Sequence, residues 1–421
     1  MSLLLGFKKD YFNYLASIIL PAIITAFTIP IFKRMLGAEH YGQYALLNNA
    51  ALITATISSG WITQSISRYY QISEKKMLFK KQSIQLSLIF QLIALLPILI
   101  TVFLIQHDAL FAILFCVLTL TCAMQFSMMV IAQANFLSGK TIFSESIRSI
   151  GFLALGFVLL RWIKIDFVYA LFIASISAFG MSVLYLKKQT TNTSGLTSDA
   201  KTTPKQIIQL AQQFFKYGAP LSLWFVVVYI FAYIDKIAML KYFGASIQGN
   251  YQAMFDLLSK GFTLIISPVL ISLFPIITLA YKEGKKEDIK NLIRKIIMYE
   301  ILGYALVSIG YFWFGANILL QILSVPNEPI FKQLGFVIIT GTFIWQIAMV
   351  VNKTFELQMK SLKMLYAAVI TLLLQLLYYF FIRNTNSPLM ISCGYLFASV
   401  SYLFILLFFI LFSSITSTHK L

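Results

Sequence analysis

The sequence predicts an all-α polytopic membrane protein, with about twelve transmembrane helices in two six-helix bundles related by a pseudo-twofold axis along the membrane normal. Three observations lead to this prediction. The 421 residues are 59% hydrophobic and only 11% charged, whereas a soluble domain carries about 25% charged residues. Apolar runs near twenty residues recur along the chain, each long enough to cross ~30 Å of hydrocarbon as a helix. A short glycine-containing motif occurs near the start of each half.

The apolar runs place the helices in order along the chain. They are continuous rather than alternating, which excludes the strands of a membrane barrel. The first run has no small-residue cleavage site after a short apolar core, so we expect it to be retained as a helix. Short connections such as Gln106-His107-Asp108 make neighbouring helices antiparallel. The predicted helices cover 11–32, 43–66, 83–105, 110–133, 144–161, 167–186, 218–240, 248–277, 292–314, 334–352, 362–382 and 388–412.

The repeated motif lies between the first two helices of each half. Leu36-Gly37-Ala38-Glu39-His40-Tyr41-Gly42-Gln43-Tyr44 recurs 207 positions later as Phe243-Gly244-Ala245-Ser246-Ile247-Gln248-Gly249-Asn250-Tyr251. The coinciding positions are Gly37 and Gly244, Ala38 and Ala245, Gly42 and Gly249, and Tyr44 and Tyr251. We expect each copy to form a tight turn, with glycines where the backbone needs a positive φ. One helix–turn–helix unit used twice implies a duplicated fold.

The distribution of Lys and Arg between alternate loops indicates how the chain is oriented in the membrane. Of the Lys and Arg in loops, at helix ends or at the termini, 23 lie at the termini and on the side of the even-numbered loops and 7 on the side of the odd-numbered loops, which places both termini in the cytoplasm. The same rule accounts for the net charge of +18, so no nucleic-acid partner is expected. A polar stretch without apolar periodicity predicts a cytoplasmic linker. We therefore expect a first bundle at 1–188, a linker at 189–213 and a second bundle at 214–421.

The chain offers no constellation for catalysis. Its three histidines, His40, His107 and His419, lie in loops or at the end of the sequence, without the spacing of a metal site or a triad. There is no phosphate-binding glycine loop of the Walker type. We expect no enzyme activity, no bound cofactor and no metal, and the functional groups must therefore be polar side chains inside the bilayer.

Several ionisable residues fall inside predicted helices. A charge at the bilayer centre costs roughly 2.5–3.5 kcal/mol, so these side chains should face one another or a hydrated interior. They are Glu145, Arg148, Asp235, Lys236, Asp256, Lys260 and Glu300. Glu145 and Arg148 are three apart and Asp256 and Lys260 four apart, so each pair shares a helix face. Two interpretations remain open: internal ion pairs, or a cavity in which Arg148, Lys236 and Lys260 bind an anionic substrate.

Polar residues of the second predicted helix extend this set. At the repeat offset Asp256 matches Asn49 and Phe255 matches Asn48, which indicates polar groups at equivalent depths in the two halves. With Gln64, these residues predict that both helices line a central path. Asparagine also serves as a hydrogen-bonding contact between membrane helices, which is the alternative interpretation.

The two motifs carry a family resemblance. The segment Leu36–Tyr44 resembles the LG-x-E-x-YG-x-Y signature of Wzx-type polysaccharide flippases, members of the superfamily that also contains the MATE multidrug exporters. The segment Asp235-Lys236-Ile237-Ala238-Met239-Leu240-Lys241-Tyr242-Phe243-Gly244-Ala245 is similar to the signature of their seventh and eighth helices. The family usually has Asp-Arg there, and Lys236 keeps the charge but loses the two-pronged geometry of a guanidinium.

The resemblance implies a flippase in the bacterial inner membrane. Its substrate would be an undecaprenyl-diphosphate-linked oligosaccharide for O-antigen, capsule or exopolysaccharide, carried by alternating access through a cationic lumen. Membrane lipid, a coupling proton or sodium ion, and the polymerase and chain-length regulator of the pathway are its implied partners. Candidate coupling carboxylates are Glu145, Asp235, Asp256 and Glu300. The alternatives are a MATE-like ion-coupled drug exporter, a relative of the lipid II flippases, whose extra helices are not predicted here, and, less favoured for want of a large outer loop, a polysaccharide polymerase or ligase.

Overall fold

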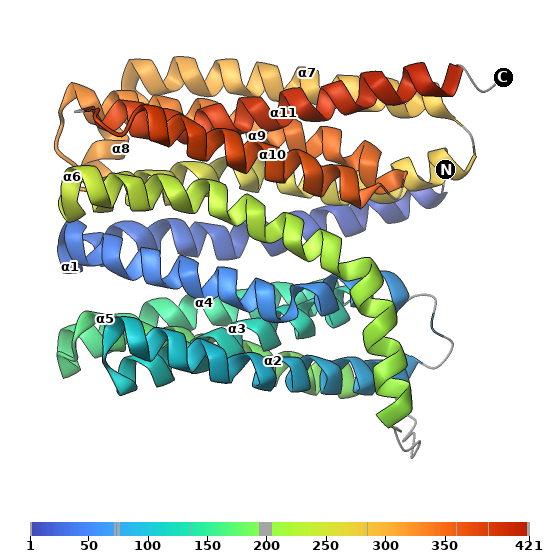
Figure 1. Cartoon of the computed structure of the whole chain (residues 1–421), viewed down its shortest axis with the longest axis horizontal. Coiled ribbons are helices and arrows are strands. Elements are labelled where there is room, and N and C mark those ends of the chain that lie inside the picture. Colours follow the sequence, from blue (N-terminus) through green and yellow to red (C-terminus); the bar gives the residue numbers. More distant parts are fainter. Residues whose placement is uncertain are drawn as a thin grey trace. The chain divides into compact units, whose positions relative to one another are not determined.

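The computed structural model describes residues 2–70, 73, 76–135, 137–192, 204–283, 285–358, 360–385 and 387–418. These residues are almost entirely helical (Figure 1). The elements are α1 (Ser2–Tyr69), α2 (Lys76–Gln106), α3 (Ala109–Ala134), α4 (Ser138–Val158), η1 (Leu159–Ile163), α5 (Phe167–Asn192), α6 (Pro204–Lys282), α7 (Lys286–Gly310), η2 (Tyr311–Gly315), α8 (Ala316–Ile322), α9 (Pro329–Leu357), α10 (Ser361–Phe381) and α11 (Pro388–Thr418). The predicted all-α polytopic membrane fold is confirmed.

Two of these elements are each a pair of helical arms joined at one glycine. α1 bends at Gly37, with φ 79° and ψ 170°, and α6 bends at Gly244, with φ 80° and ψ 174°. This backbone region is essentially restricted to glycine, because any Cβ is crowded there. The predicted positive φ is therefore confirmed at both repeat positions. Nine helices of the described residues are long and apolar enough to span a membrane, and one of them, Lys205–Gly261, includes the bend of α6.

The chain divides into two compact units. Unit 1 comprises residues 1–28 and 47–226, and unit 2 comprises residues 29–46 and 227–421. The bend of α1 at Gly37 thus belongs to unit 2, although the rest of α1 belongs to unit 1. Of the expected linker, residues 193–203 lie outside the described part of the chain.

Unit 1 is held together by α2, α3, α4 and α5 and by close packing between α1 and the start of α6. α2 packs on α3, and α5 packs on both α3 and α4. Ser65 on α1 donates to the carbonyl of Phe214 on α6 at 2.8 Å. A Cβ on Gly218 would lie 1.9 Å from the carbonyl oxygen of Trp61, so only glycine lets these two backbones come together.

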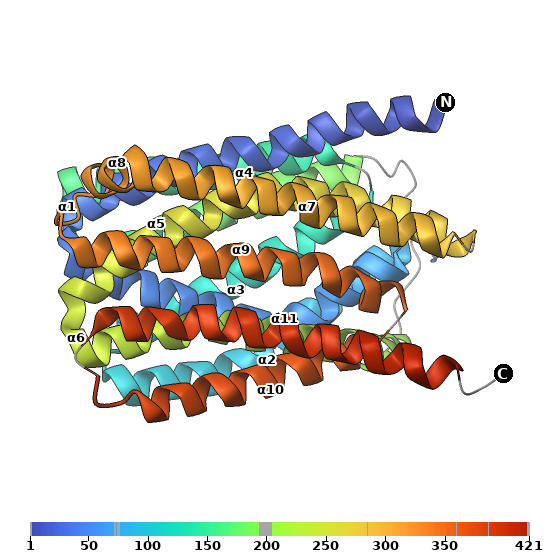
Figure 2. The same cartoon turned by 90° about the horizontal axis from the view of Figure 1, so that it is seen from above.

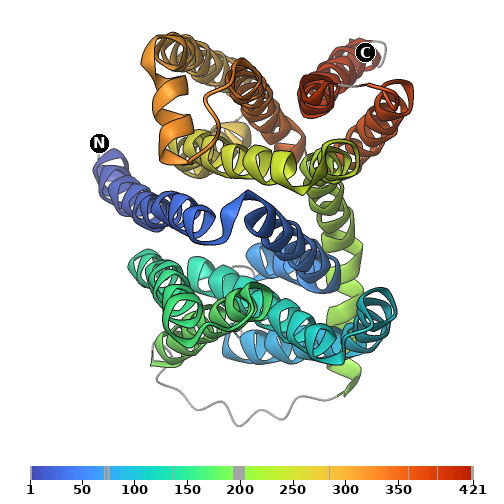
Figure 3. The same cartoon turned by 90° about the vertical axis from the view of Figure 1, so that its left-hand side faces the viewer.

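Unit 2 is organised around α9, which packs between α7 and α11 (Figure 2). α10 packs on α11 in turn. Figure 3, which looks along the helices, shows α7, α9, α10 and α11 running side by side. The bend of α1, the bend of α6 and the short helix α8 lie at the same end of this unit (Figures 1 and 2).

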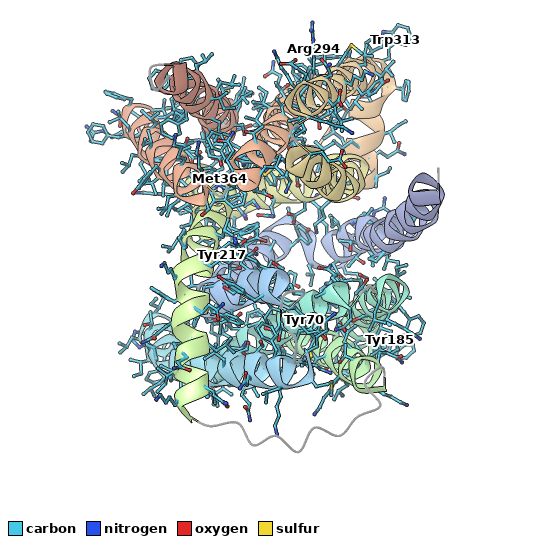
Figure 4. The ribbon with its side chains drawn as sticks, turned by 90° about the vertical axis from the view of Figure 1, so that its right-hand side faces the viewer. Tyr70, Tyr185, Tyr217, Arg294, Trp313 and Met364 are labelled. Carbon is cyan, nitrogen blue, oxygen red and sulfur yellow. The ribbon has the colours of Figure 1, made fainter. Side chains whose placement is uncertain are left out.

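Large aromatic side chains cover the outside of the helices. Trp162 in η1 is 73% exposed and Trp313 in η2 is 80% exposed. Figure 4 shows Trp313 and Arg294 pointing away from their helices. Tryptophans on the outside of apolar helices are typical of residues that sit at the membrane–water interface.

The connection between α2 and α3 shows how a short loop is fixed. His107 adopts a positive φ of 53°, and Asp108 caps α3 by accepting a hydrogen bond from the backbone N–H of Phe111 at 3.0 Å. The hydroxyl of Tyr169, at the start of α5, also donates to Asp108 and holds the pKa of that carboxyl below its usual range.

Candidate functional site

The first charged group lies in unit 1 on α4. The guanidinium of Arg148 donates through Nε and Nη2 to Oε2 of Glu145, at 3.0 and 2.7 Å. Gln125 on α3 donates to the other carboxylate oxygen of Glu145. The ring of Phe179 on α5 lies 5.4 Å from the guanidinium carbon. The predicted shared face is confirmed, and the two charges form an ion pair.

This ion pair is only partly buried. The side chain of Arg148 is 29% exposed and that of Glu145 is 21% exposed. Both groups can therefore be reached from outside the protein without unpacking α4. An anion that approached the pair would compete with Glu145 for the guanidinium, which suits phosphate oxygens because it presents its N–H groups as a fork.

The second charged group lies in unit 2 around Asp235 on α6, which is fully buried. Its Oδ2 accepts from the hydroxyl of Tyr251 at 3.1 Å and from the backbone N–H of Tyr395 at 3.0 Å. Its Oδ1 accepts from the hydroxyl of Tyr379 and from Nε2 of Gln375, the latter at 3.2 Å. Four donors from α6, α10 and α11 thus converge on one carboxylate.

The neighbouring charges are also withdrawn from solvent. Lys236 is 4% exposed, and its amine lies 4.5 Å from the ring centroid of Phe255, a cation–π contact. Asp256 is half-buried and accepts a hydrogen bond at 3.1 Å from the hydroxyl of Tyr41, which lies on α1 beyond the bend. Lys260 is exposed. The ion pairs of the described residues do not include Asp256 with Lys260, since the carboxylate turns toward Tyr41 instead.

Glu300 on α7 differs from the other three carboxylates. It is 9% exposed, and neither carboxylate oxygen has a hydrogen-bond partner among the residues that the structure describes. One turn before it, Ile296 packs with Val350 of α9, and one turn after it the hydroxyl of Tyr304 lies 3.0 Å from Oγ1 of Thr340 of α9. Glu300 therefore shares the helix face that packs on α9.

The remaining predicted residues are distributed between the units. Asn48, Asn49 and Gln64 are half-buried on the second arm of α1, in unit 1. In the repeated motifs, Tyr44 and Tyr251 are buried and Glu39 is exposed. No group of three or more His, Cys, Asp or Glu side chains gathers in the described part of the chain in a way that would hold a metal ion.

Two motif glycines have a role other than the predicted one. Gly42 and Gly249 are helical rather than at positive φ. A Cβ on Gly249 would lie 1.7 Å from the carbonyl oxygen of Ala38, and one on Gly42 would lie 2.1 Å from Oε1 of Gln248. These glycines permit close approach of the two motifs within unit 2, so their assignment to the turns was wrong.

Sequence reasoning missed the tyrosines and amides that surround the charges. Tyr41 and Gln248 lie within the two repeated motifs, so their positions in the sequence could have marked them as candidates. Tyr379, Tyr395 and Gln375 contact Asp235 from 140 or more residues away in sequence, and no spacing pattern points to them.

Residues 7–280 match the profile of a family described as polysaccharide biosynthesis protein. The chain belongs to this family. No curated protein matches it. The family match spans both copies of the glycine motif and includes the two charged groups at Glu145–Arg148 and Asp235.

Several solved structures have a fold similar to that of this chain. A multidrug resistance MATE family transporter of the MOP superfamily, in an inward-facing conformation, is 13% identical with a TM-score of 0.65, covering 99% of this chain and 96% of that one. The MATE transporter VcmN of Vibrio cholerae, as a variant, is 14% identical with a TM-score of 0.67, covering 97% and 96%. A MATE protein in a bent conformation is 14% identical with a TM-score of 0.63, covering 98% and 96%. The resemblance seen in the sequence is confirmed.

Proposed function

We propose that this protein is a flippase that moves an undecaprenyl-diphosphate-linked oligosaccharide from the cytoplasmic to the periplasmic leaflet of the bacterial inner membrane. The observation that carries the proposal is the match to the polysaccharide biosynthesis family over residues 7–280. The MATE-like fold supports it, because the similar structures are those of transporters. Both termini are cytoplasmic in this proposal, with bundles at 1–188 and 214–421.

The chemistry of such a substrate matches the charges inside the helices. A diphosphate with attached sugars does not cross hydrocarbon unaided, whereas its polyprenyl tail can remain in lipid. Transport occurs by alternating access, and Arg148 and Lys260 meet the diphosphate because their side chains are at least partly exposed, whereas Lys236 is held against the ring of Phe255. Arg148 makes the first contact, since its ion pair is partly exposed and a diphosphate can replace Glu145.

An export experiment in cells tests this role. We expect Arg148→Ala to lower surface polysaccharide by roughly tenfold or more, because a charge-assisted hydrogen bond contributes ~1.5–3 kcal/mol. Arg161→Ala is the matched control, since Arg161 is exposed in η1 and should leave export unchanged. Export is quantified per copy of protein found in the membrane. Normal export by Arg148→Ala at normal abundance would contradict the assignment of Arg148 to the substrate.

We propose that the coupling ion is a proton carried by Glu300. A buried carboxylate without hydrogen-bond partners is strongly unfavourable when ionised, whereas the protonated acid is tolerated at much lower cost. Asp235, Asp256 and Glu145 each have hydrogen-bond donors that stabilise the charged form. Of the four candidate carboxylates, Glu300 is thus the one best suited to gain and lose a proton during the transport cycle.

The coupling role predicts a specific loss. Glu300→Gln should remove the dependence of transport on a proton gradient in reconstituted vesicles, while transport without a gradient persists. Glu287→Gln is the control, because Glu287 is exposed at the start of the same helix. A Glu300→Gln protein that still responds to the gradient like the unsubstituted protein would refute coupling at this residue.

A further inference from the structure

The bend of α1 is a segment of the first half of the chain that docks within unit 2. Residues 29–46 belong to unit 2, while the residues on both sides of them belong to unit 1. We call residues 29–46 the α1 turn. Because both of its ends lead into the other unit, any movement between the units must strain, shift or release this segment. The contacts that hold the α1 turn therefore bear on conformational change.

Two cations attach the α1 turn to the C-terminal end of α8. Nζ of Lys33 donates to the carbonyls of Leu323 and Ser324, at 2.6 and 3.1 Å, although Lys33 is only 3% exposed. Arg34 donates to Oγ of Ser324 at 3.2 Å, and through Nη2 to the carbonyls of Ile322 and Gln321 at 3.1 and 3.4 Å. The carbonyls at the C-terminal end of a helix carry partial negative charge, so both cations favour the docked turn.

On α6, the surface that meets the α1 turn carries amides without partners. Gln248 and Gln252 are fully buried, and neither amide oxygen nor amide nitrogen of either residue has a hydrogen-bond partner among the described residues. Oε1 of Gln248 lies against Gly42 of the turn, and Asp256, two helical turns further along α6, accepts from Tyr41 of the turn. Because the spacing is i, i+4 and i+8, Gln252 lies on the same face, between these two contacts.

Buried amides that lack partners disfavour the docked state. Each would regain its hydrogen bonds from water if the α1 turn moved away from α6. The docked turn is thus held by the hydrogen bonds of Lys33, Arg34 and Tyr41 and opposed by Gln248 and Gln252. The close contact at Gly249 and Ala38 makes the docked geometry specific without adding polar interactions.

We propose that the α1 turn is a gate balanced between these two opposing contributions, and that its release hydrates Gln248 and Gln252. The gate goes beyond the transport proposal, because it concerns which conformation the protein adopts rather than what it carries. A protein that transported a different substrate could still have this gate.

Spin-label distances between two exposed positions of unit 2 test the gate. The labels are placed at Glu39→Cys in the turn and Asn327→Cys after α8, with Cys116, Cys122 and Cys393 replaced by serine. Both label sites are exposed, so the labels do not enter the contact. A docked turn gives a short distance between the labels, and a released turn adds a second population of molecules with a longer distance.

Two substitutions to methionine, at different positions, should change the ratio of released to docked protein in opposite directions. Lys33→Met removes donors that hold the turn and should raise the ratio of released to docked protein by about tenfold. Gln252→Met removes unpaired amide atoms while keeping an unbranched side chain of similar length, and should lower that ratio by about the same factor. Lys241→Met is the control. Lys241 is exposed on α6 at the repeat position that corresponds to Arg34, and its replacement should leave the ratio unchanged.

Opposite changes of the ratio in the two variants distinguish the gate from a general loss of stability, which would change the ratio in the same direction in both. Unchanged distances in Lys33→Met would overturn the proposal, and so would a larger released population in Gln252→Met. If either variant fails to fold, as judged by a monodisperse elution profile, the other still decides. Because the readout is a distance, the outcome is independent of the export experiment.

Discussion

Replacing Asp235 with alanine should destabilise the protein more than any other single loss of a charge described above. Asp235 accepts hydrogen bonds from Tyr251, Tyr379, Gln375 and the backbone of Tyr395, in a fully buried position. Removing the carboxylate takes an acceptor from all four donors where water does not reach, although Gln375 and Tyr379 keep a second one, the backbone carbonyls of Phe231 and Ile391. Breaking such a network costs about 3–5 kcal/mol, which corresponds to a fall of roughly 10 °C in melting temperature.

The melting temperature of the detergent-solubilised protein measures this effect. Tyr379→Phe removes one of the donors and should give a smaller fall, since the loss of one hydrogen bond costs ~1 kcal/mol. Asp288→Ala, at an exposed position in the first turn of α7, should change stability by less than about 1 kcal/mol. If Asp235→Ala melted at the same temperature as Asp288→Ala, the four contacts would not contribute to stability as argued.

Replacing Gly249 with alanine should be the most damaging change of a single methyl group. The added Cβ would lie 1.7 Å from the carbonyl oxygen of Ala38, far inside any tolerated contact. Since the clash is with backbone, no side-chain rotation relieves it, and the two helices must separate. We expect a loss of at least about 3 kcal/mol, the upper part of the range for overpacking.

The same substitution elsewhere gives the matched comparison. Gly180 lies in α5, and a Cβ there would meet nothing within 4 Å. Gly180→Ala should leave stability unchanged or raise it by up to ~1 kcal/mol, because alanine is the better helix former. Thermal unfolding of the two purified variants decides. Equal melting temperatures would show that the helices do not approach at Gly249 as closely as described.

Local patterns in the sequence predicted much of this fold. Continuous apolar runs predicted the helices, because hydrocarbon requires that a spanning segment satisfy its own backbone. The fixed offset of the two motifs predicted that Gly37 and Gly244 share a positive φ. The spacing of Glu145 and Arg148 predicted that they share a helix face, since residues three apart on a helix are neighbours, and left their ion pair as one of two open interpretations.

Contacts between distant segments could not be predicted in the same way. The spacing of Asp256 and Lys260 allows an ion pair, but the carboxylate instead accepts from Tyr41, 215 residues away. The donors around Asp235 come from α10 and α11 as well as α6, and their convergence depends on how the helices pack. Gly42 and Gly249 resemble turn glycines in sequence, since a need for close approach and a need for positive φ both select glycine.

The transport proposal is tested most directly by reconstitution. The purified protein is placed in lipid vesicles that contain a diphosphate-linked oligosaccharide with a long polyprenyl tail, and movement of the sugar to the other leaflet is followed. We predict faster movement than in protein-free vesicles, and a slower rate with Arg148→Ala than with Arg161→Ala. No acceleration by a folded protein, or acceleration only of a cationic drug, would contradict the account.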